Sequence, residues 1–168
     1  MELREAIQKI LETAVHAPSG DNSQPWEFRI HGNEIHIFNI PNRDATLYNF
    51  EQRGSYFSHG ALVENIDIVS RSFGFSTKIT LFPDTAASEH TATVVLNKSE
   101  TRQDPLLPYI KKRATNRKPY KKISLELNHL SALLGVTRLF GLPKDTVRFV
   151  EDRENIELLG KIISLNER

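Results

Sequence analysis

The sequence predicts an α+β fold in which an antiparallel or mixed sheet packs against helices. Two observations support this prediction. Apolar residues recur with helical spacing near the N-terminus and again between residues 62 and 73, and apolar and polar residues alternate in two pairs of strand-like runs. The chain has 168 residues, of which 39% are hydrophobic. That length suits one domain that buries its own core without disulfides or structural metals.

The first part of the chain predicts a helix followed by a hairpin. Leu3, Ile7 and Ile10 mark one face of a helix that should end at Ala17, because a proline disfavours helical geometry in the residue before it. Alternation on both sides of His31-Gly32-Asn33 predicts a β-hairpin. The next predicted elements are a connecting loop over residues 41–53, a helix over 62–73 ending at Gly74, strands over 78–82 and 91–96, and a surface linker over 97–105.

Beyond the linker the pattern predicts shorter elements. These are helices over residues 106–113, 125–134 and 155–165, and a strand over 147–150. We therefore expect two parts, residues 1–104 as a first half and residues 105–168 as the incomplete start of a second half.

Composition and motif content exclude several function classes. The chain has no cysteine, which rules out thiol chemistry and cysteine-bound metals and fits a reducing cytoplasm. Its charged N-terminal residues are unlike a secretory signal. The sequence has no run of 18 consecutive apolar residues, so it predicts no membrane span. Neither a Walker A nor a G-x-G-x-x-G motif is present, and no G-x-S-x-G surrounds Ser19. The six histidines are scattered, so we assign no metal site.

The segment Ala17-Pro18-Ser19-Gly20-Asp21-Asn22-Ser23-Gln24-Pro25-Trp26 joins the first helix to the first strand. Its hydroxyl and amide side chains could hydrogen-bond a planar polar ligand, and Gly20 would let the backbone come close to it. The alternative is an ordinary turn that ends the helix and anchors Trp26 in the core. Residue types alone leave both interpretations open.

A basic segment follows the predicted linker. Residues 111–122 hold seven Lys or Arg and no acid, although the formal net charge of the whole chain is only +1. Arg113 and Arg117, with Thr115 between them, could bind one phosphate, because a guanidinium presents a bidentate fork to it. A solvated basic face is the alternative, and a nucleic-acid contact strip beside Tyr120 is a third interpretation.

These two motifs together resemble the FMN-dependent nitroreductase family. The run A-P-S-G-x-N-x-Q-P-W before an F-x-I strand is similar to the family's flavin-contacting loop, and R-x-T-x-R-x-Y at 113–120 is similar to its flavin-phosphate motif. The loop precedes the Arg motif here, an order that resembles the longer Acg-type branch. Further runs also resemble that branch, namely Asn42-Arg43-Asp44, Gln52-Arg53, Ser58 to Asn65, and Leu81-Phe82-Pro83-Asp84. The resemblance covers most of residues 5–125.

The resemblance implies a cofactor site and its residues. Arg113, Thr115 and Arg117 would hold the FMN phosphate and ribityl chain. The residues expected against the ring system are Pro18, Ser19, Gly20, Asn22 and Gln24. Arg53 matches an arginine of the longer branch, and its role stays open. No side chain is expected to act as nucleophile or proton donor, because the flavin carries the electron transfer.

The implied activity is transfer of electrons from NAD(P)H through FMN to a nitroaromatic, quinone or similar acceptor. In the family the flavin lies between two subunits or repeats, and the second half expected after residue 113 is largely missing, so the chain looks truncated. We therefore expect a homodimer, and the absence of cysteine favours a cytoplasmic location. The alternatives are a flavin-binding domain without turnover and a nucleic-acid-binding module, and the resemblance favours the flavin.

Overall fold

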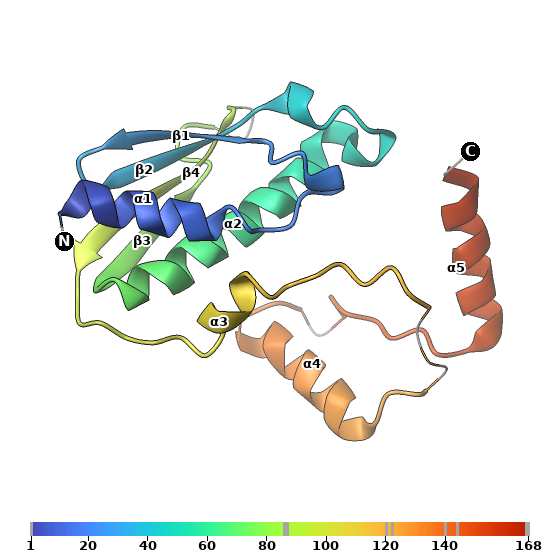
Figure 1. The fold of residues 1–168 in the computed structure, drawn as a ribbon. Coiled ribbons are helices and arrows are strands. Elements are labelled where there is room, and N and C mark those ends of the chain that lie inside the picture. The colour runs from blue at the N-terminus through green and yellow to red at the C-terminus, as the bar shows by residue number, and fades with distance from the viewer. Residues whose placement is uncertain are drawn as a thin grey trace. The chain divides into compact units, whose positions relative to one another are not determined.

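The protein is described from a computed structural model that covers residues 2–85, 88–119, 121, 123–139, 141–143 and 145–166 (Figure 1). The chain divides into two compact units, Met1–Thr115 and Asn116–Arg168. The predicted halves, residues 1–104 and 105–168, are defined by the functional motif that each carries and not by compactness. That division of the motifs stays a prediction.

In the described part of the first unit, four strands form one antiparallel sheet in the order β1-β2-β4-β3 (Figure 1). β1 (Trp26–His31) and β2 (Glu34–Asn39) form the predicted hairpin, and Gly32 adopts the left-handed backbone that its turn requires. β3 (Phe75–Leu81) and β4 (His90–Lys98) form the second pair, with β4 between β2 and β3. The predicted α+β class with an antiparallel sheet is confirmed.

Two helices cover one face of this sheet. α1 (Leu3–Ala14) packs against α2 (Arg53–Ser72), and α2 packs against β3 and β4 (Figure 1). α1 ends at Ala14 rather than at Ala17, where we predicted its end. The amides of His16 and Ala17 still bond to carbonyls of the preceding turn, so the chain leaves the helix through a tight, irregular turn.

Apolar side chains between the helices and the sheet form the core of the first unit. Alternate residues of β2 and β4 point into it, as a strand with one buried face requires. The largest fully buried apolar side chains are Ile7, Ile10, Ile35, Ile37, Leu62, Ile66, Val69 and Val94. Opposite this buried face, the other face of the sheet is more polar, and we call it the outer face.

α2 begins at Arg53, well before the predicted start at residue 62. Its first turns bury Ser55, Ser58 and His59, so no apolar periodicity marks them in the sequence. Two short 3₁₀ turns, Pro41–Arg43 and Leu47–Gln52, occupy the predicted loop before it.

The later elements agree with the sequence only in part. α3 (Leu107–Ile110) is shorter than predicted, whereas α4 (Leu127–Leu139) and α5 (Arg153–Asn166) lie close to their predicted positions. The strand predicted over residues 147–150 is wrong, because no strand pairs with this segment in the described part of the chain. A strand forms only where a neighbour completes its hydrogen bonds.

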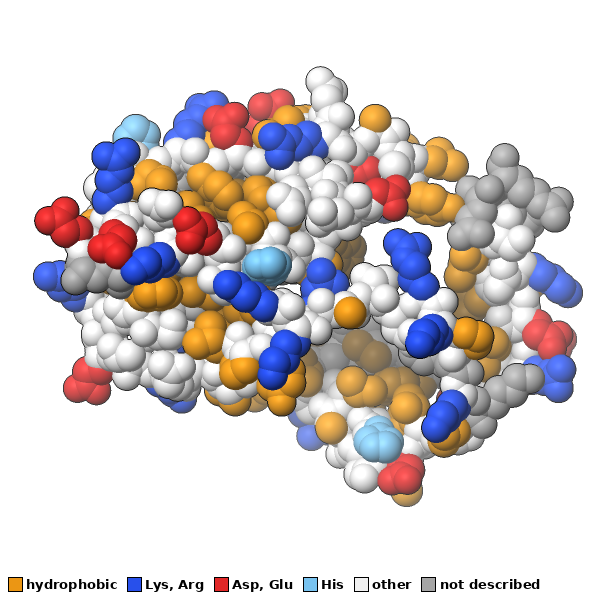
Figure 2. Space-filling view, viewed as in Figure 1, with side chains coloured by type: hydrophobic (Ala, Val, Ile, Leu, Met, Phe, Trp, Pro, Cys, Tyr) orange, Lys and Arg blue, Asp and Glu red, His pale blue; other side chains and the backbone are white. Residues whose placement is uncertain are grey.

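The described residues of the second unit bury no apolar side chain. Figure 2 shows hydrophobic side chains at the surface around α4 and α5. The exposed ones in this unit are Ile123, Leu125, Leu127, Leu133, Val136, Leu139, Leu142, Val147, Val150, Ile156, Leu158, Leu159, Ile162 and Ile163. None of the described helices is both long and apolar enough to span a bilayer.

Candidate functional site

The loop between α1 and β1 has an unusual backbone. Asp21, Asn22 and Gln24 all adopt positive φ, between 45° and 58°. Left-handed geometry is unfavourable for residues with a Cβ, by roughly 1–2 kcal/mol each. Non-glycine residues keep such a backbone only where surrounding contacts hold them in it.

Several hydrogen bonds hold the loop in this shape. The amide of Gln24 donates to Ser19 Oγ over 3.0 Å, and the amide of Ser23 donates to the carbonyl of Gly20 over 2.8 Å. Arg43 Nη1 donates to the carbonyl of Gln24 over 2.9 Å. Pro18, Asp21 and Asn22 are exposed, so the loop presents polar groups at the surface of the first unit.

Gly20 has a structural reason to be glycine. A Cβ at this position would lie 2.6 Å from Asp44 Oδ2. Asp44 is buried, and its other carboxylate oxygen accepts hydrogen bonds from the amide and hydroxyl of Thr46. Gly20 therefore allows this close packing whether or not a ligand binds.

The end of the loop is anchored in the core, as the turn interpretation predicted for Trp26. Trp26 is 5% exposed and packs edge-on against the His59 ring, with the ring centroids 6.1 Å apart. His59 Nε2 donates to the carbonyl of Pro25 over 2.9 Å, and Thr91 Oγ1 lies 2.8 Å from His59 Nδ1. Burial lowers the pKa of His59, which favours the neutral form of the ring. The anchoring and binding interpretations are compatible, because the anchor follows the exposed part of the loop.

The structure brings the first arginine of the basic segment to this loop. Arg113 Nη2 lies 3.5 Å from the carbonyl oxygen of His16, two residues before Pro18. The turn after α3 directs the chain there, since the amides of Lys112 and Arg113 both bond to the carbonyl of Tyr109. Arg113 is exposed, so its guanidinium can reach a ligand at the loop.

The other residues of the predicted phosphate motif lie further along the chain. Thr115 is exposed at the end of the first unit, and Arg117 is exposed in the second unit. Tyr120, the last residue of the motif, lies outside the described residues. The convergence of Arg113 and Arg117 on one phosphate therefore stays a prediction.

Two further observations concern whether the loop fits a ligand. Ser23 Oγ is buried within the loop and has no hydrogen-bond partner among the described residues. An orphaned buried hydroxyl calls for a partner that a bound molecule or water would supply. Arg53, whose role the sequence left open, pairs with Glu51 at 2.8 Å and lies over the Phe50 ring, so its charge is engaged within its own turn.

Sequence analysis missed two residues that shape this site. Arg43 fixes the carbonyl of Gln24, and Asp44 packs against Gly20. Both belong to the Asn42-Arg43-Asp44 run, so the resemblance marked the segment without giving these roles. Nothing in the spacing along the chain indicates that residues 43 and 44 contact residues 20 and 24.

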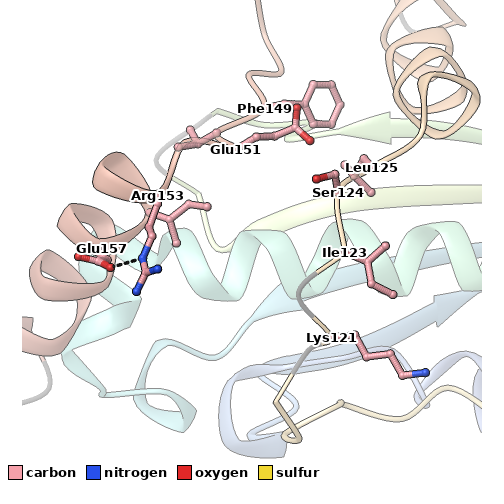
Figure 3. A pocket seen from close by; sticks show the side chains of 10 residues that line it. Lys121, Ile123, Ser124, Leu125, Phe149, Glu151, Arg153 and Glu157 are labelled. Atoms are coloured by element: carbon pink, nitrogen blue, oxygen red, sulfur yellow. Dashed lines mark hydrogen bonds and ion pairs between the residues drawn. The ribbon is translucent and has the colours of Figure 1, made fainter.

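A hollow of about 690 Å³ lies within the second unit, and none of the predicted site residues lines it (Figure 3). Ile123, Leu125 and Phe149 give it an apolar lining, and the remaining lining residues are Lys121, Ser124, Val150, Glu151, Arg153, Ile156 and Glu157. Arg153 and Glu157 form an ion pair at its rim, with 2.8 Å between Nε and Oε1. It has no group that matches the predicted flavin contacts.

Comparison with known proteins gives a weak but consistent result. No family model matches the sequence. Over 125 residues the chain is 28% identical to proteins provisionally named NAD(P)H nitroreductase from two strains of Mycobacterium tuberculosis, a match that covers 69% of this chain and 34% of theirs. The chain thus spans about a third of the length of the curated relatives it matches.

Solved structures show similarity at a lower level. A provisionally assigned NADH oxidase from Clostridium acetobutylicum is 17% identical with a TM-score of 0.48, covering 75% of this chain and 89% of that one. A provisionally assigned nitroreductase with FMN from Desulfovibrio desulfuricans is 18% identical with a TM-score of 0.44, covering 70% and 86%. Because these TM-scores lie below 0.5, they do not establish a shared fold.

Proposed function

We propose that this chain is a nitroreductase-like flavoprotein that uses FMN to carry electrons from NAD(P)H to a nitroaromatic, quinone or similar small molecule. The observation that supports it most is the position of the Arg113 guanidinium beside the end of α1, next to the exposed loop from Pro18 to Gln24. The names of the Mycobacterium tuberculosis relatives agree with this activity.

The proposal gives this chain's residues the tasks of binding and orienting the cofactor. Arg113, Thr115 and Arg117 would bind the phosphate through charge-assisted hydrogen bonds. Pro18, Ser19, Gly20, Asn22 and Gln24 would contact the ring system, and the Ser19 hydroxyl can donate there while it accepts the amide of Gln24. When bound, FMN supplies the two-electron chemistry.

The location and assembly of the protein belong to the same proposal. A cytoplasmic location would give it access to nicotinamide cofactors, and a homodimer would let a second copy complete the pocket. The uncovered apolar surface of the second unit supports a homodimer, because large apolar surfaces commonly mark protein interfaces.

Flavin binding tests the central claim. We expect FMN to bind the purified protein and its fluorescence to change. Replacing both Arg113 and Arg117 with Ala should weaken binding by about 100-fold or more, since hydrogen bonds to charged groups are worth about 1.5–3 kcal/mol each. The matched control is the double substitution Arg4→Ala and Arg148→Ala, which removes the same charge from exposed positions elsewhere. Equal affinity in the two double variants would refute the assigned phosphate contacts.

Turnover distinguishes an enzyme from a binding domain. NAD(P)H oxidation with a quinone acceptor should exceed the rate that the same concentration of FMN alone gives. Binding without this excess rate would mean a flavin-binding domain without activity. Salt-sensitive binding of oligonucleotides, with no affinity for FMN, would instead favour a nucleic-acid contact along residues 111–122.

A further inference from the structure

The outer face of the sheet carries a pair of histidines that the flavin proposal does not use. His36 lies on β2 and His90 at the start of β4, beside the irregularity in the pairing of these strands. Their side chains are only partly exposed, 21% for His36 and 9% for His90. His36 Nδ1 and His90 Nε2 face each other across 3.4 Å.

Each ring is oriented by a carboxylate on its far side. His36 Nε2 lies 3.2 Å from Glu34 Oε2, and His90 Nδ1 lies 3.2 Å from Asp84 Oδ2. An ionised carboxylate only accepts hydrogen bonds, so it favours the tautomer whose proton points toward it. In the neutral pair both facing nitrogens then present lone pairs to each other.

Thr93 cannot satisfy both of these nitrogens. Its Oγ1 lies 2.9 Å from His90 Nε2 and 3.3 Å from His36 Nδ1, but a hydroxyl has a single proton to donate. One lone pair is left facing another in a partly buried place. A cation between the rings would relieve this conflict.

The spacing fits a transition metal ion. Two nitrogens bound to zinc at 2.0–2.1 Å with a tetrahedral angle lie about 3.3–3.4 Å apart. The centroids of two such rings would be about 5.2 Å apart, and those of His36 and His90 are 5.2 Å apart. Metal-bound histidines also commonly donate their second N–H to a carboxylate, and each ring here has a carboxylate oxygen 3.2 Å from its second nitrogen.

We propose that His36 and His90 form a two-histidine site for a divalent transition metal ion such as Zn²⁺. Thr93 Oγ1 and water would complete the coordination, since no three His, Asp or Glu side chains converge on an ion among the residues that the structure describes. Imidazole suits zinc and its neighbours in the series, whereas Mg²⁺ and Ca²⁺ prefer oxygen ligands.

The charges around the pair are compatible with a cation. Glu34 and Asp84 contribute two negative charges. Arg29 is the cross-strand neighbour of His36, and its charge is engaged with Glu27 at 2.9 Å and with the Phe38 ring. The His31 ring lies 5.4 Å from the His36 ring and adds no charge while neutral.

Metal titration of the full chain tests this proposal. Calorimetry with ZnCl₂ at pH 7.5 should show saturable binding of one ion per chain. His90→Gln should weaken it by at least tenfold, and Asp84→Asn by about 10- to 100-fold, the usual effect of removing a carboxylate behind a ligand. His129→Gln, which changes an exposed histidine of α4, is the matched control and should bind as the unaltered protein does.

A spectroscopic readout on the unaltered chain covers the case in which a variant fails to fold. Nitrogen-15 spectra of the imidazoles should show Zn²⁺ shifting His36 Nδ1 and His90 Nε2, with His59 unchanged. Absence of saturable Zn²⁺ binding would overturn the proposal, as would shifts confined to other histidines. It would equally fail if the pair titrated with pH but did not respond to Zn²⁺, because the rings would then share only a proton.

Discussion

His59 lies in the core of the first unit, where folding removes its imidazole from water. Burial lowers its pKa below 6.5, although the hydrogen bond to Pro25 opposes that shift. A group with a lowered folded-state pKa binds protons more readily when unfolded. Its contribution to stability is therefore complete above pH 6.5 and declines as the pH falls from there toward the folded-state pKa.

We expect this difference in pKa to produce a measurable loss of stability with acidification. The free energy of unfolding should fall between pH 7.5 and 5.5, with a contribution from His59 of up to about 1.4 kcal/mol per pH unit. Urea unfolding across this range should show a shallower decline for His59→Gln, whereas His129→Gln should follow the unaltered protein. Parallel pH curves for His59→Gln and the unaltered protein would contradict the assignment.

Gly20 gives a second prediction for a single residue. Gly20→Ala should lower the free energy of unfolding by about 1–3 kcal/mol, the usual effect of overpacking, because Asp44 is buried and held by Thr46. Gly60 lies within α2, where an added Cβ would meet no atom within 4 Å, so Gly60→Ala should stabilise by up to about 1 kcal/mol. Denaturation of both variants tests the contrast, and equal effects would refute it.

The sequence indicated this site at the level of segments but not of contacts. Turn-forming residues at 18–24 predicted a polar loop, and Arg113 stood out in a basic run. The left-handed backbone at Gln24 depends on Arg43, and the glycine at 20 depends on Asp44, both distant in the chain. Local pattern cannot reveal such contacts, because they are set by tertiary packing.

Helices were predictable where apolar residues form one stripe along the helix, and strands were predictable where apolar and polar residues alternate. The β1–β2 hairpin and the helical centre of α2 follow that rule. The start of α2 does not, because Ser55 and His59 fill its buried positions and are satisfied by hydrogen bonds. The apolar run at 147–150 fails for the opposite reason, since alternation without a pairing strand does not make a sheet.

The early start of α2 depends on Asn49. Its Oδ1 accepts the amide of Ser55 over 2.9 Å, and its Nδ2 donates to Ser55 Oγ and to the carbonyl of Asp44. One buried side chain thus satisfies an amide in the first turn of the helix and fixes the preceding segment.

Asn49→Ala should therefore destabilise the first unit by about 1–3 kcal/mol, because it leaves buried polar groups without partners. Hydrogen exchange should also become faster at the first turns of α2, whereas the core strand β4 should change less. Asn42→Ala alters an exposed amide in the same region and should have little effect on either measurement. Similar losses in the two variants would mean that Asn49 does not hold the start of α2.

At the scale of the whole molecule, the two units differ in how much of their apolar surface they bury. The first encloses a core of aliphatic side chains between two helices and a sheet. The second leaves most of its described apolar side chains exposed, with Leu127 at 85% and Leu139 at 83%. Burying such side chains is worth roughly 1.5–3 kcal/mol each, which provides a driving force for association.

We predict that this surface holds two copies together. Light scattering should give a mass near twice the 19.2 kDa of one chain, and the double substitution Leu127→Glu and Leu139→Glu should shift the protein toward the monomer. Because neither leucine is buried in one chain, the variant should keep the circular dichroism of the unaltered protein. The double substitution Asn42→Glu and Gln103→Glu, which adds the same charge at exposed positions of the first unit, is the matched control. A monomer at all concentrations would contradict the prediction, and so would a dimer that survives the double substitution, since its interface would then lie elsewhere.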